Sequence, residues 1–343
     1  MIPVLCVHSL IHPSFLMSLS GRHFGTATDD IKFHDEKYMS ILNDTAEFGW
    51  ITTENQFKWG RTQPEQGVWN FSAVNLVVNQ ALSHGQQIRG HCLIWHIEQP
   101  TWLEIGDWTA QELDEIMEEH INKSMTPYVG KVAAWDVVNE VIADEPRGEM
   151  RTSFWYNIMG AEYIDKAYHH AHAVDPAAKL WINDYWVEEA GPKADGYYNL
   201  IDGMLSRGVP LHGVGFQCHF SVGRLPDEDD LRTNMQRFAD LGVKIAMLEI
   251  DIRIDLPVTA EKLEQQATDY AVLARVCMNI DGCVGQTVWD FSDTWNWLPE
   301  GSTQGAAVLW NTDYERKPAY YSTIEQLQQV DQLYDVRMYS EGA

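Results

Sequence analysis

Residues 229–252 read DDLRTNMQRFADLGVKIAMLEIDI, and this stretch contains the unit from which the fold can be deduced. In Asp229–Leu241 the apolar residues recur at helical spacing. Gly242 follows as a helix stop. Lys244–Ile252 is then a short apolar run that is rich in β-prone residues. The sequence therefore predicts a helix followed at once by a buried strand.

The same kind of strand recurs along the chain, with helical stretches such as Ala110–Lys123, Glu261–Asn279 and Asp35–Leu42 between the strands and Gly208 as another helix stop. Eight strand-like runs can be counted: Phe24–Thr28, Trp50–Glu54, Ile88–Trp95, Ala134–Glu140, Lys179–Tyr185, Gly213–Phe220, Lys244–Ile252 and Cys283–Phe291. Strand–helix alternation repeated eight times implies parallel strands that close into a single (β/α)₈ TIM barrel, an α/β fold.

Length and composition agree with one large globular domain. The chain has 343 residues, of which 45% are hydrophobic and 22% are charged. One α/β barrel can fill a chain of this length. We expect residues 21–343 to form the barrel domain, preceded by residues 1–20 as either a secretory signal or an irregular lead-in. No stretch is apolar enough for a transmembrane span.

The charge of the chain restricts its partners. Asp and Glu number 50 against 24 Lys and Arg, a formal net charge of −26. Such a surface repels nucleic acid and anionic membranes, so we expect neither as a partner. A neutral polysaccharide would not be repelled. We expect the protein to act as a monomer.

Cysteine spacing and glycosylation acceptors bear on where the protein works. Cys277 and Cys283 are six residues apart, a spacing that suits a local staple where a helix leads into a strand. Asn43, Asn70 and Asn122 each begin an Asn-X-Ser/Thr acceptor, which matters only if the chain is secreted. We expect a secreted, extracellular glycoprotein.

Functional residues of such a barrel lie at the carboxyl ends of its strands. The polar and aromatic residues at those ends are Glu54, Asn55, Lys58, His91, Trp95, His96, Asn139, Glu140, Asn183, Asp184, Gln217, His219, Glu249, Asp251, Trp289, Trp295 and Trp297. Residues two apart on a strand share a face, so Gln217 points with His219 and Glu249 with Asp251. Asn139 and Glu140 cannot both face inward on a regular strand, so the strand is predicted to end or bulge there.

Two glutamates at the tips of separate strands, surrounded by Trp, His, Asn and Gln, suit the hydrolysis of a glycoside. One carboxylic acid can protonate the glycosidic oxygen while the other carboxylate attacks the anomeric carbon. Aromatic rings stack on the C–H faces of sugars, and amides and imidazoles bind hydroxyl groups. The alternative for these carboxylates is a buried lattice of ion pairs.

Five motifs in a fixed order give the chain a resemblance to glycoside hydrolase family ten, the retaining endo-β-1,4-xylanases, over roughly residues 21–325. The motifs are Glu54-Asn-Gln-Phe-Lys-Trp59, Gly90-His-Cys-Leu-Ile-Trp-His96, Trp135-Asp-Val-Val-Asn-Glu140, Gln217-Cys-His219 and Met247-Leu-Glu-Ile-Asp-Ile252. The resemblance implies that Glu140 is the acid/base and Glu249 the nucleophile, about 5–5.5 Å apart. It implies a disulfide between Cys277 and Cys283, and neither a cofactor nor a metal.

The resemblance also implies roles for the surrounding residues. Asn139 would bind the 2-hydroxyl of the sugar, His219 would orient Glu249, and Asp251 would hold His219. The substrate-binding residues that it implies are Glu54, Asn55, Lys58, His91, Trp95, Glu98, Gln217, Trp289 and Trp297. Two positions depart from the family pattern: Glu98 stands where Gln is usual, and Trp186 follows Tyr185 where Asn is usual.

Other interpretations of the same sequence remain. A related β-glycosidase could act on a cellulose-like glycan or, as tomatinase-like members do, on a glycosylated steroidal alkaloid. An inactive carbohydrate-binding barrel would commonly lose one catalytic Glu, and this chain has both. His169, His170 and His172 are more readily a solvated helix face than a metal site. Cys218 is more readily packing than a nucleophile, and the role of His96 is left open.

Overall fold

The computed structural model describes residues 12–328. Its centre is a closed barrel of eight parallel strands, in which β1 pairs with both β2 and β9, and β8 closes the ring by pairing with β9. The strands are β1 (His23–Thr28), β2 (Trp50–Thr53), β3 (Gln87–Ile94), β4 (Ala134–Asn139), β5 (Lys179–Asp184), β6 (Gly213–Phe216), β8 (Lys244–Asp255) and β9 (Cys283–Val288). The predicted (β/α)₈ TIM barrel is confirmed.

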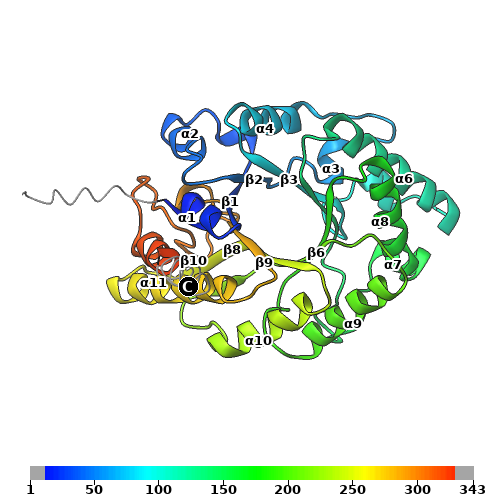
Figure 1. Cartoon of the computed structure of the whole chain (residues 1–343). Helices are drawn as coiled ribbons and strands as arrows, with labels where there is room; N and C mark the ends of the chain where they lie inside the picture. Colours follow the sequence, from blue (N-terminus) through cyan, green and yellow to red (C-terminus); the bar gives the residue numbers. More distant parts are fainter. Residues whose placement is uncertain (1–11, 329–343) are drawn as a thin grey trace, which may run out of the picture.

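Helices surround the strands on the outside of the barrel (Figure 1). They are α1 (Pro13–Leu19), α2 (Glu36–Leu42), α3 (Trp59–Thr62), α4 (Ser72–Ser83), α5 (Thr101–Glu104), α6 (Ala110–Met125), α7 (Phe154–Met159), α8 (Glu162–Val174), α9 (Pro192–Ser206), α10 (Glu228–Ala239) and α11 (Ala260–Met278). Residues 318–328 are also helical. Short 3₁₀ turns occur at η1 (Asp30–Lys32), η2 (Thr126–Tyr128) and η3 (Asp293–Trp295).

Helix α6 shows how local sequence places a helix against the barrel. The Thr109 side chain accepts a hydrogen bond from the Glu112 N–H while the Glu112 carboxylate accepts from the Thr109 N–H, a capping box that fixes where the helix begins. Leu113, Met117 and Ile121 follow at spacings of four and are buried against the strands. The helix predicted for Ala110–Lys123 is therefore present, and its apolar face packs on the core.

The predicted sixth strand, Gly213–Phe220, is wrong as a single element. It divides into β6 and the short β7 (His219–Ser221), which pairs with β8. Between the two, Cys218 takes a positive φ of 62°, a conformation that breaks an extended strand. The Cys218 N–H donates to the buried carboxylate of Glu188 at 2.7 Å. This side chain takes the place of the backbone carbonyl that would accept the bond in a continuous strand.

The strand that carries Glu140 ends as predicted. β4 stops at Asn139, and Glu140 has a φ of 59°. The Glu140 N–H still donates to the carbonyl of Asn183 on the neighbouring strand, at 2.8 Å. This turn lets Asn139 and Glu140, which are adjacent in sequence, both reach the open end of the barrel.

The segment before the barrel, residues 1–20, was expected to be a secretory signal or an irregular lead-in. Residues 1–11 lie outside the described part. The rest is not irregular, because Pro13 begins α1, Met17 is fully buried, and the Ser14 N–H donates to the carbonyl of Ala46 at 3.0 Å. None of the described helices is both long and apolar enough to cross a membrane.

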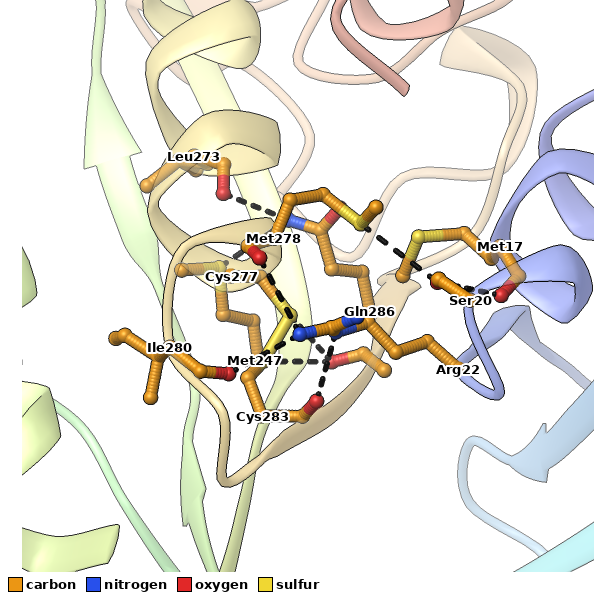
Figure 2. Close-up of a disulfide and its surroundings, with 11 residues drawn as sticks. Met17, Ser20, Arg22, Met247, Leu273, Cys277, Met278, Ile280, Cys283 and Gln286 are labelled. Atoms are coloured by element: carbon orange, nitrogen blue, oxygen red, sulfur yellow. Dashed lines mark hydrogen bonds between the residues drawn. A yellow bond between two sulfur atoms is a disulfide. The ribbon is translucent and has the colours of Figure 1, made fainter. Parts of the chain in front are cut away.

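A disulfide joins Cys277, near the end of α11, to Cys283 at the start of β9 (Figure 2). This pairing was implied by the family resemblance and is confirmed. Figure 2 also shows the Arg22 guanidinium, which donates to the carbonyls of Met278, Ile280 and Cys283 at 3.0–3.2 Å. The chain entering β1 is thereby attached to the same corner that the disulfide holds.

Candidate active site

A cavity of ≈380 Å³ opens at the carboxyl ends of the barrel strands. It is lined by the two glutamates and by most of the predicted substrate-binding residues, namely Glu54, Asn55, Lys58, His91, Trp95, Asn139, Glu140, Gln217, His219, Glu249, Trp289 and Trp297. Strands β2, β3, β4, β6, β8 and β9 thus each contribute a side chain or the loop that follows them. Of the residues with a predicted catalytic or substrate-binding role, Asp251 and Glu98 do not line it.

Glu140 is held by neutral donors. Its Oε2 accepts a hydrogen bond from Trp95 Nε1 at 2.8 Å, and its Oε1 accepts from Gln217 Nε2 at 3.0 Å. The side chain is only about one-tenth exposed, so the charged form has lost most of its solvation. Burial, together with the nearby carboxylates of Asp184 and Glu249, raises the pKa of Glu140 against the opposing effect of the two hydrogen bonds.

Glu249 meets a different environment across the cavity. Its Oε1 accepts from Asn183 Nδ2 at 2.6 Å, and its Oε2 lies 3.3 Å from His219 Nε2. His91 Nδ1 is 3.9 Å from the same carboxylate. The side chain is buried like that of Glu140, but each of its oxygens faces a nitrogen, one on an amide and one on an imidazole.

His219 is a cation in this arrangement. Its Nδ1 lies 2.6 Å from Asp251 Oδ2. Burial alone would lower the pKa of His219, but the carboxylates of Asp251 and Glu249 raise it to about 10. Trp297 Nε1 donates to the same Asp251 oxygen at 2.7 Å, which fixes the indole beside His219. The contacts expected between His219 and both Asp251 and Glu249 are therefore present.

On the β2 side of the cavity, three polar residues form a connected group. Lys58 Nζ donates to Asn55 Oδ1 at 2.7 Å and lies 4.9 Å above the centre of the Trp95 ring. Asn55 in turn donates to Asp29 through its N–H at 3.0 Å and its Nδ2 at 2.6 Å. The loop after β1 thereby positions residues that follow β2.

Glu54 is held from the same loop by Lys32. The Lys32 ammonium is buried and contacts both Glu54 Oε2 and Asp290 Oδ2. Burial raises the pKa of Asp290 to about 6 despite the neighbouring Lys32, and burial and Glu54 likewise raise the pKa of Asp29 to about 6. One ammonium therefore stands among three buried carboxylates.

We expect Lys32→Met to lower the free energy of unfolding by about 3–5 kcal/mol near neutral pH, since it leaves Glu54 and Asp290 without their shared cation. A raised carboxyl pKa means that the folded state holds a proton the unfolded state has lost, so stability falls as pH rises from about 4 to 6. The loss in Lys32→Met should therefore be smaller at pH 4 than at pH 7. Urea unfolding at both pH values measures it.

Lys37→Met is the matched control, because Lys37 is exposed on the neighbouring helix α2. Its unfolding midpoint should stay close to that of the parent protein. Equal losses at pH 4 and pH 7 in the Lys32 variant would contradict the role assigned to this ammonium.

Glu98 is turned away from the cavity. It has a φ of 57°, and its carboxylate lies 4.0 Å from Arg61 Nε on the surface. His96, whose role was left open, has its Nδ1 4.0 Å from Glu140 Oε2. Burial lowers the pKa of His96 to about 4, so it is a neutral neighbour of the acid.

Five residues of the site had no catalytic or substrate-binding role in the sequence prediction. Asn183 contacts Glu249 and also donates to Asn139 Oδ1 at 3.2 Å, while Ile97, Tyr185, Trp186 and Arg253 line the cavity. Asn183 was visible as a polar residue at a strand end, and Trp186 as a departure from the family pattern. Ile97 and Arg253 gave no sequence signal.

Trp186 separates the catalytic cavity from a second one. The neighbouring cavity has a volume of ≈340 Å³ and is lined by Trp186 together with Lys193, Phe220 and Pro226. Trp186 is 57% exposed, so its ring face is free to contact a ligand. Trp186 is therefore the one described side chain that the two cavities share as lining.

Positive φ values gather at this end of the barrel. Among the described non-glycine residues with positive φ are Glu98, Glu140, Trp186, Cys218 and Asp290, each within a few residues of the end of β3, β4, β5, β6 or β9. Such conformations are unfavourable for residues with a Cβ and occur where a site requires them.

The site can therefore carry out acid-assisted attack on an acetal. A carboxyl group with a raised pKa can remain protonated beside a second carboxylate in a different environment, which is how two glutamates take different roles. Ring faces of Trp95, Trp289 and Trp297 and the amides around them suit a sugar.

Comparison with known proteins agrees with this geometry. The chain is 44% identical over 299 residues to endo-1,4-beta-xylanase A of Phanerodontia chrysosporium, covering 87% of this chain and 72% of that protein. It superposes on native xylanase 10B of Thermotoga maritima with a TM-score of 0.90, at 34% identity, covering 94% of this chain and 99% of that one. For xylanase 10B of Thermotoga petrophila RKU-1 in complex with xylobiose, the TM-score is 0.89 at 34% identity, with 94% and 98% covered.

The family model of Glycosyl hydrolase family 10 matches residues 15–326, which is nearly the whole described chain. The match includes both glutamates, every cavity-lining residue named above and the disulfide. The chain therefore belongs to glycosyl hydrolase family 10.

Proposed function

We propose that the protein is a retaining endo-β-1,4-xylanase that hydrolyses internal linkages of xylan. The proposal rests on the different environments of the two glutamates in one cavity. Glu140 accepts hydrogen bonds from neutral donors and has a raised pKa. Glu249 instead faces the His219 cation. The xylanases to which the chain is similar support xylan as the substrate.

The reaction proceeds in two displacements. Glu249 attacks the anomeric carbon, the glycosidic C–O bond breaks, and the Glu140 proton passes to the departing oxygen. Glu140 then takes a proton from water, whose oxygen attacks the same carbon and releases Glu249. Retention requires a separation of about 5–5.5 Å between the two carboxyl groups.

The remaining side chains would bind the sugars. Glu54, Asn55 and Lys58 would hold a sugar distal to the cleaved bond, and Asn139 the 2-hydroxyl of the reacting sugar. His91, Trp95, Gln217, Trp289 and Trp297 would contact the sugars nearest the cleaved bond. The cavity beyond Trp186 would receive the chain on the other side, which suits cleavage inside a polymer.

The setting of the reaction follows from the surface and the disulfide. A net charge of −26 neither attracts nor repels a neutral polysaccharide. A disulfide is typical of proteins that work in an oxidising compartment, so we propose an extracellular enzyme. We propose that it acts as a monomer, since side chains of this one chain hold both glutamates through direct hydrogen bonds.

Incubation with xylan, carboxymethylcellulose and tomatine tests this function. We expect xylan alone to be cleaved readily, into a ladder of oligosaccharides from the first minutes. Proton NMR of fresh products should show the β-anomer first, as retention requires. A protein with Glu249→Gln, purified in parallel, controls for contaminating activity.

The other outcomes separate the alternatives. Sugar release from tomatine or cleavage of carboxymethylcellulose in preference to xylan would identify a related β-glycosidase. Binding of xylan without products would identify a carbohydrate-binding barrel. Monomer sugars alone, with no intermediate sizes, would contradict the internal mode of cleavage.

A further inference from the structure

The amino-terminal end of the barrel, opposite the catalytic glutamates, contains a cavity of ≈350 Å³ that we call the basal cavity. Five of its lining residues are the first residues of their strands, β1, β2, β4, β5 and β8: His23, Trp50, Ala134, Lys179 and Lys244. The basal cavity therefore lies a full strand length away from the acid and the nucleophile, and the reaction proposed above makes no use of it.

Aromatic rings line the basal cavity, and two of them fit only because a glycine, which has no Cβ, lies against each ring. A Cβ on Gly285 would come within 2.4 Å of the His23 ring, and a Cβ on Gly213 within 2.5 Å of the Trp181 ring. His23 also stacks on Trp50, with 4.4 Å between ring centres. These rings are thus fixed by close packing inside the barrel rather than placed on a mobile surface.

The charge of the basal cavity is opposite to that of the whole chain. Its lining includes Arg22, Arg89, Lys179 and Lys244, and among the described residues that line it there is neither Asp nor Glu. The chain as a whole carries a net charge of −26. A cluster of four cations without a lining carboxylate is therefore a local exception that needs an explanation.

Arg89 is buried with part of its guanidinium unsatisfied. The side chain is 4% exposed, and its Nη1 lies 3.6 Å from Asp136 on the inner side. Its Nη2 has no hydrogen-bond partner among the described atoms, although it is buried. The guanidinium stacks on Trp181 at 4.5 Å, and the Trp181 Nε1 is likewise buried without a described partner. Leaving two buried donors unpaired is unfavourable, and an acceptor in the cavity would relieve it.

The remaining polar groups of the basal cavity are also donors. Lys179 and Lys244 are exposed at its mouth, and neither forms an ion pair with a described carboxylate within 4.0 Å. His212 accepts the Leu180 N–H at its Nδ1, at 3.1 Å, so a neutral His212 ring carries its proton on Nε2. Burial lowers the pKa of His23 to about 3, which makes His23 neutral.

Arg22 adds positive charge and has no carboxylate partner among residues 12–328. Its Nε and Nη2 donate to backbone carbonyls of the disulfide corner, as Figure 2 shows, and those partners are neutral. The guanidinium is held in one position by these bonds, so it contributes a fixed charge to the wall of the basal cavity.

We propose that the basal cavity is a binding site for a small oxyanion, such as phosphate or the carboxylate of a sugar acid. Arg89 Nη2 and Trp181 Nε1 would donate to the anion inside the cavity, and the ammonium groups of Lys179 and Lys244 would attract it at the mouth. Charge-assisted hydrogen bonds of this kind are the strongest that neutral-pH side chains offer. A metal cation or a basic ligand would be repelled.

A ligand that binds only the folded protein raises its melting temperature, so thermal unfolding measures the proposed site directly. We expect sodium phosphate at pH 7 to raise the melting temperature by about 2 °C or more over sodium chloride of the same ionic strength. Sodium sulfate and sodium glucuronate, tested in parallel, distinguish a tetrahedral oxyanion from a carboxylate, and neutral glucose should have no effect.

Two variants locate the effect. The double variant Lys179→Gln/Lys244→Gln should lose most of the phosphate shift, and Trp181→Phe, which keeps an aromatic ring but removes the indole N–H, should reduce it. The matched control is Lys37→Gln/Lys123→Gln, with the same change in net charge at exposed lysines on α2 and α6, and it should keep the full shift. Without phosphate, the lysine variants should cleave xylan at the parent rate.

Titration calorimetry gives a second readout that does not depend on unfolding. Phosphate should bind the parent and the control pair with one site per chain, and should bind the Lys179/Lys244 pair at least about tenfold more weakly. A phosphate shift no larger than that of chloride, or an equal shift in the Lys179/Lys244 pair and the control pair, would overturn the proposal.

Discussion

We expect Glu249→Gln to hydrolyse xylan about 10⁵-fold more slowly than the parent protein, a loss of about 7 kcal/mol in transition-state stabilisation. The amide keeps the shape of the side chain but cannot form the glycosyl ester on which the two-step route depends. Asn183 and His219 hold the side chain at position 249 in place, and they can still contact the oxygen of an amide there. The shape of the cavity should therefore be kept, and the substrate should still bind. The measurement is turnover of xylohexaose together with its binding by calorimetry.

Azide identifies the side from which Glu249 acts. In Glu249→Gly, azide fills the vacated space and attacks the anomeric carbon, the glycosidic C–O bond breaks, and Glu140 protonates the departing oxygen. One displacement inverts the centre, so the product should be the α-glycosyl azide. Glu264→Gln, at an exposed position on α11, should keep the parent rate. A β-glycosyl azide from the Glu249 variant would contradict the assignment of Glu249 as the nucleophile.

For Glu140→Ala we expect a loss that depends on the leaving group. Hydrolysis of xylan, whose leaving oxygen needs a proton, should fall by about 10²–10⁴. Release of 4-nitrophenolate from an aryl β-xylobioside needs no proton, so its first step should change little and the glycosyl-enzyme should accumulate. Azide added to this variant should attack that intermediate and give the β-glycosyl azide.

The pH profile gives an independent test of Glu140. Burial, with Asp184 and Glu249, raises the pKa of Glu140, so the acid stays protonated to higher pH than an ordinary glutamate. The parent kcat/KM for xylan should fall as pH rises through that pKa, because the proton donor is lost. With the aryl substrate, Glu140→Ala should lack this alkaline fall. An unchanged alkaline fall in the variant would show that another group is the acid.

The sequence was sufficient to predict the barrel because each strand–helix unit carries its own local pattern. Eight such units with parallel strands form a closed (β/α)₈ barrel. The predicted ends of β2, β3, β4 and β5 lie one residue too far along the chain, whereas β8 ends three residues later and β9 three residues earlier than predicted. The sixth strand was wrong because Glu188, far away in sequence, accepts the Cys218 N–H and allows the strand to break. A local pattern cannot contain that information.

The two glutamates and the aromatic residues could be predicted because strand ends and family motifs mark them. The contact of Asn183 with Glu249 crosses the barrel, so it depends on which neighbouring ends meet. Lys32 looks in sequence like an ordinary surface charge, yet it is buried against Glu54 and Asp290. Glu98 occupies a motif position, but its positive φ turns it toward Arg61.

The positive φ values around the catalytic mouth have a consequence for efforts to make the enzyme heat-resistant. Each costs roughly 1–2 kcal/mol for a residue with a Cβ. Replacing Trp186 by Asn, which tolerates φ near 54°, would relax the backbone and also remove the exposed ring. A substitution that raises the melting temperature at this end of the barrel would thus lower the rate of turnover. Thermostable variants are better sought on the outer helices.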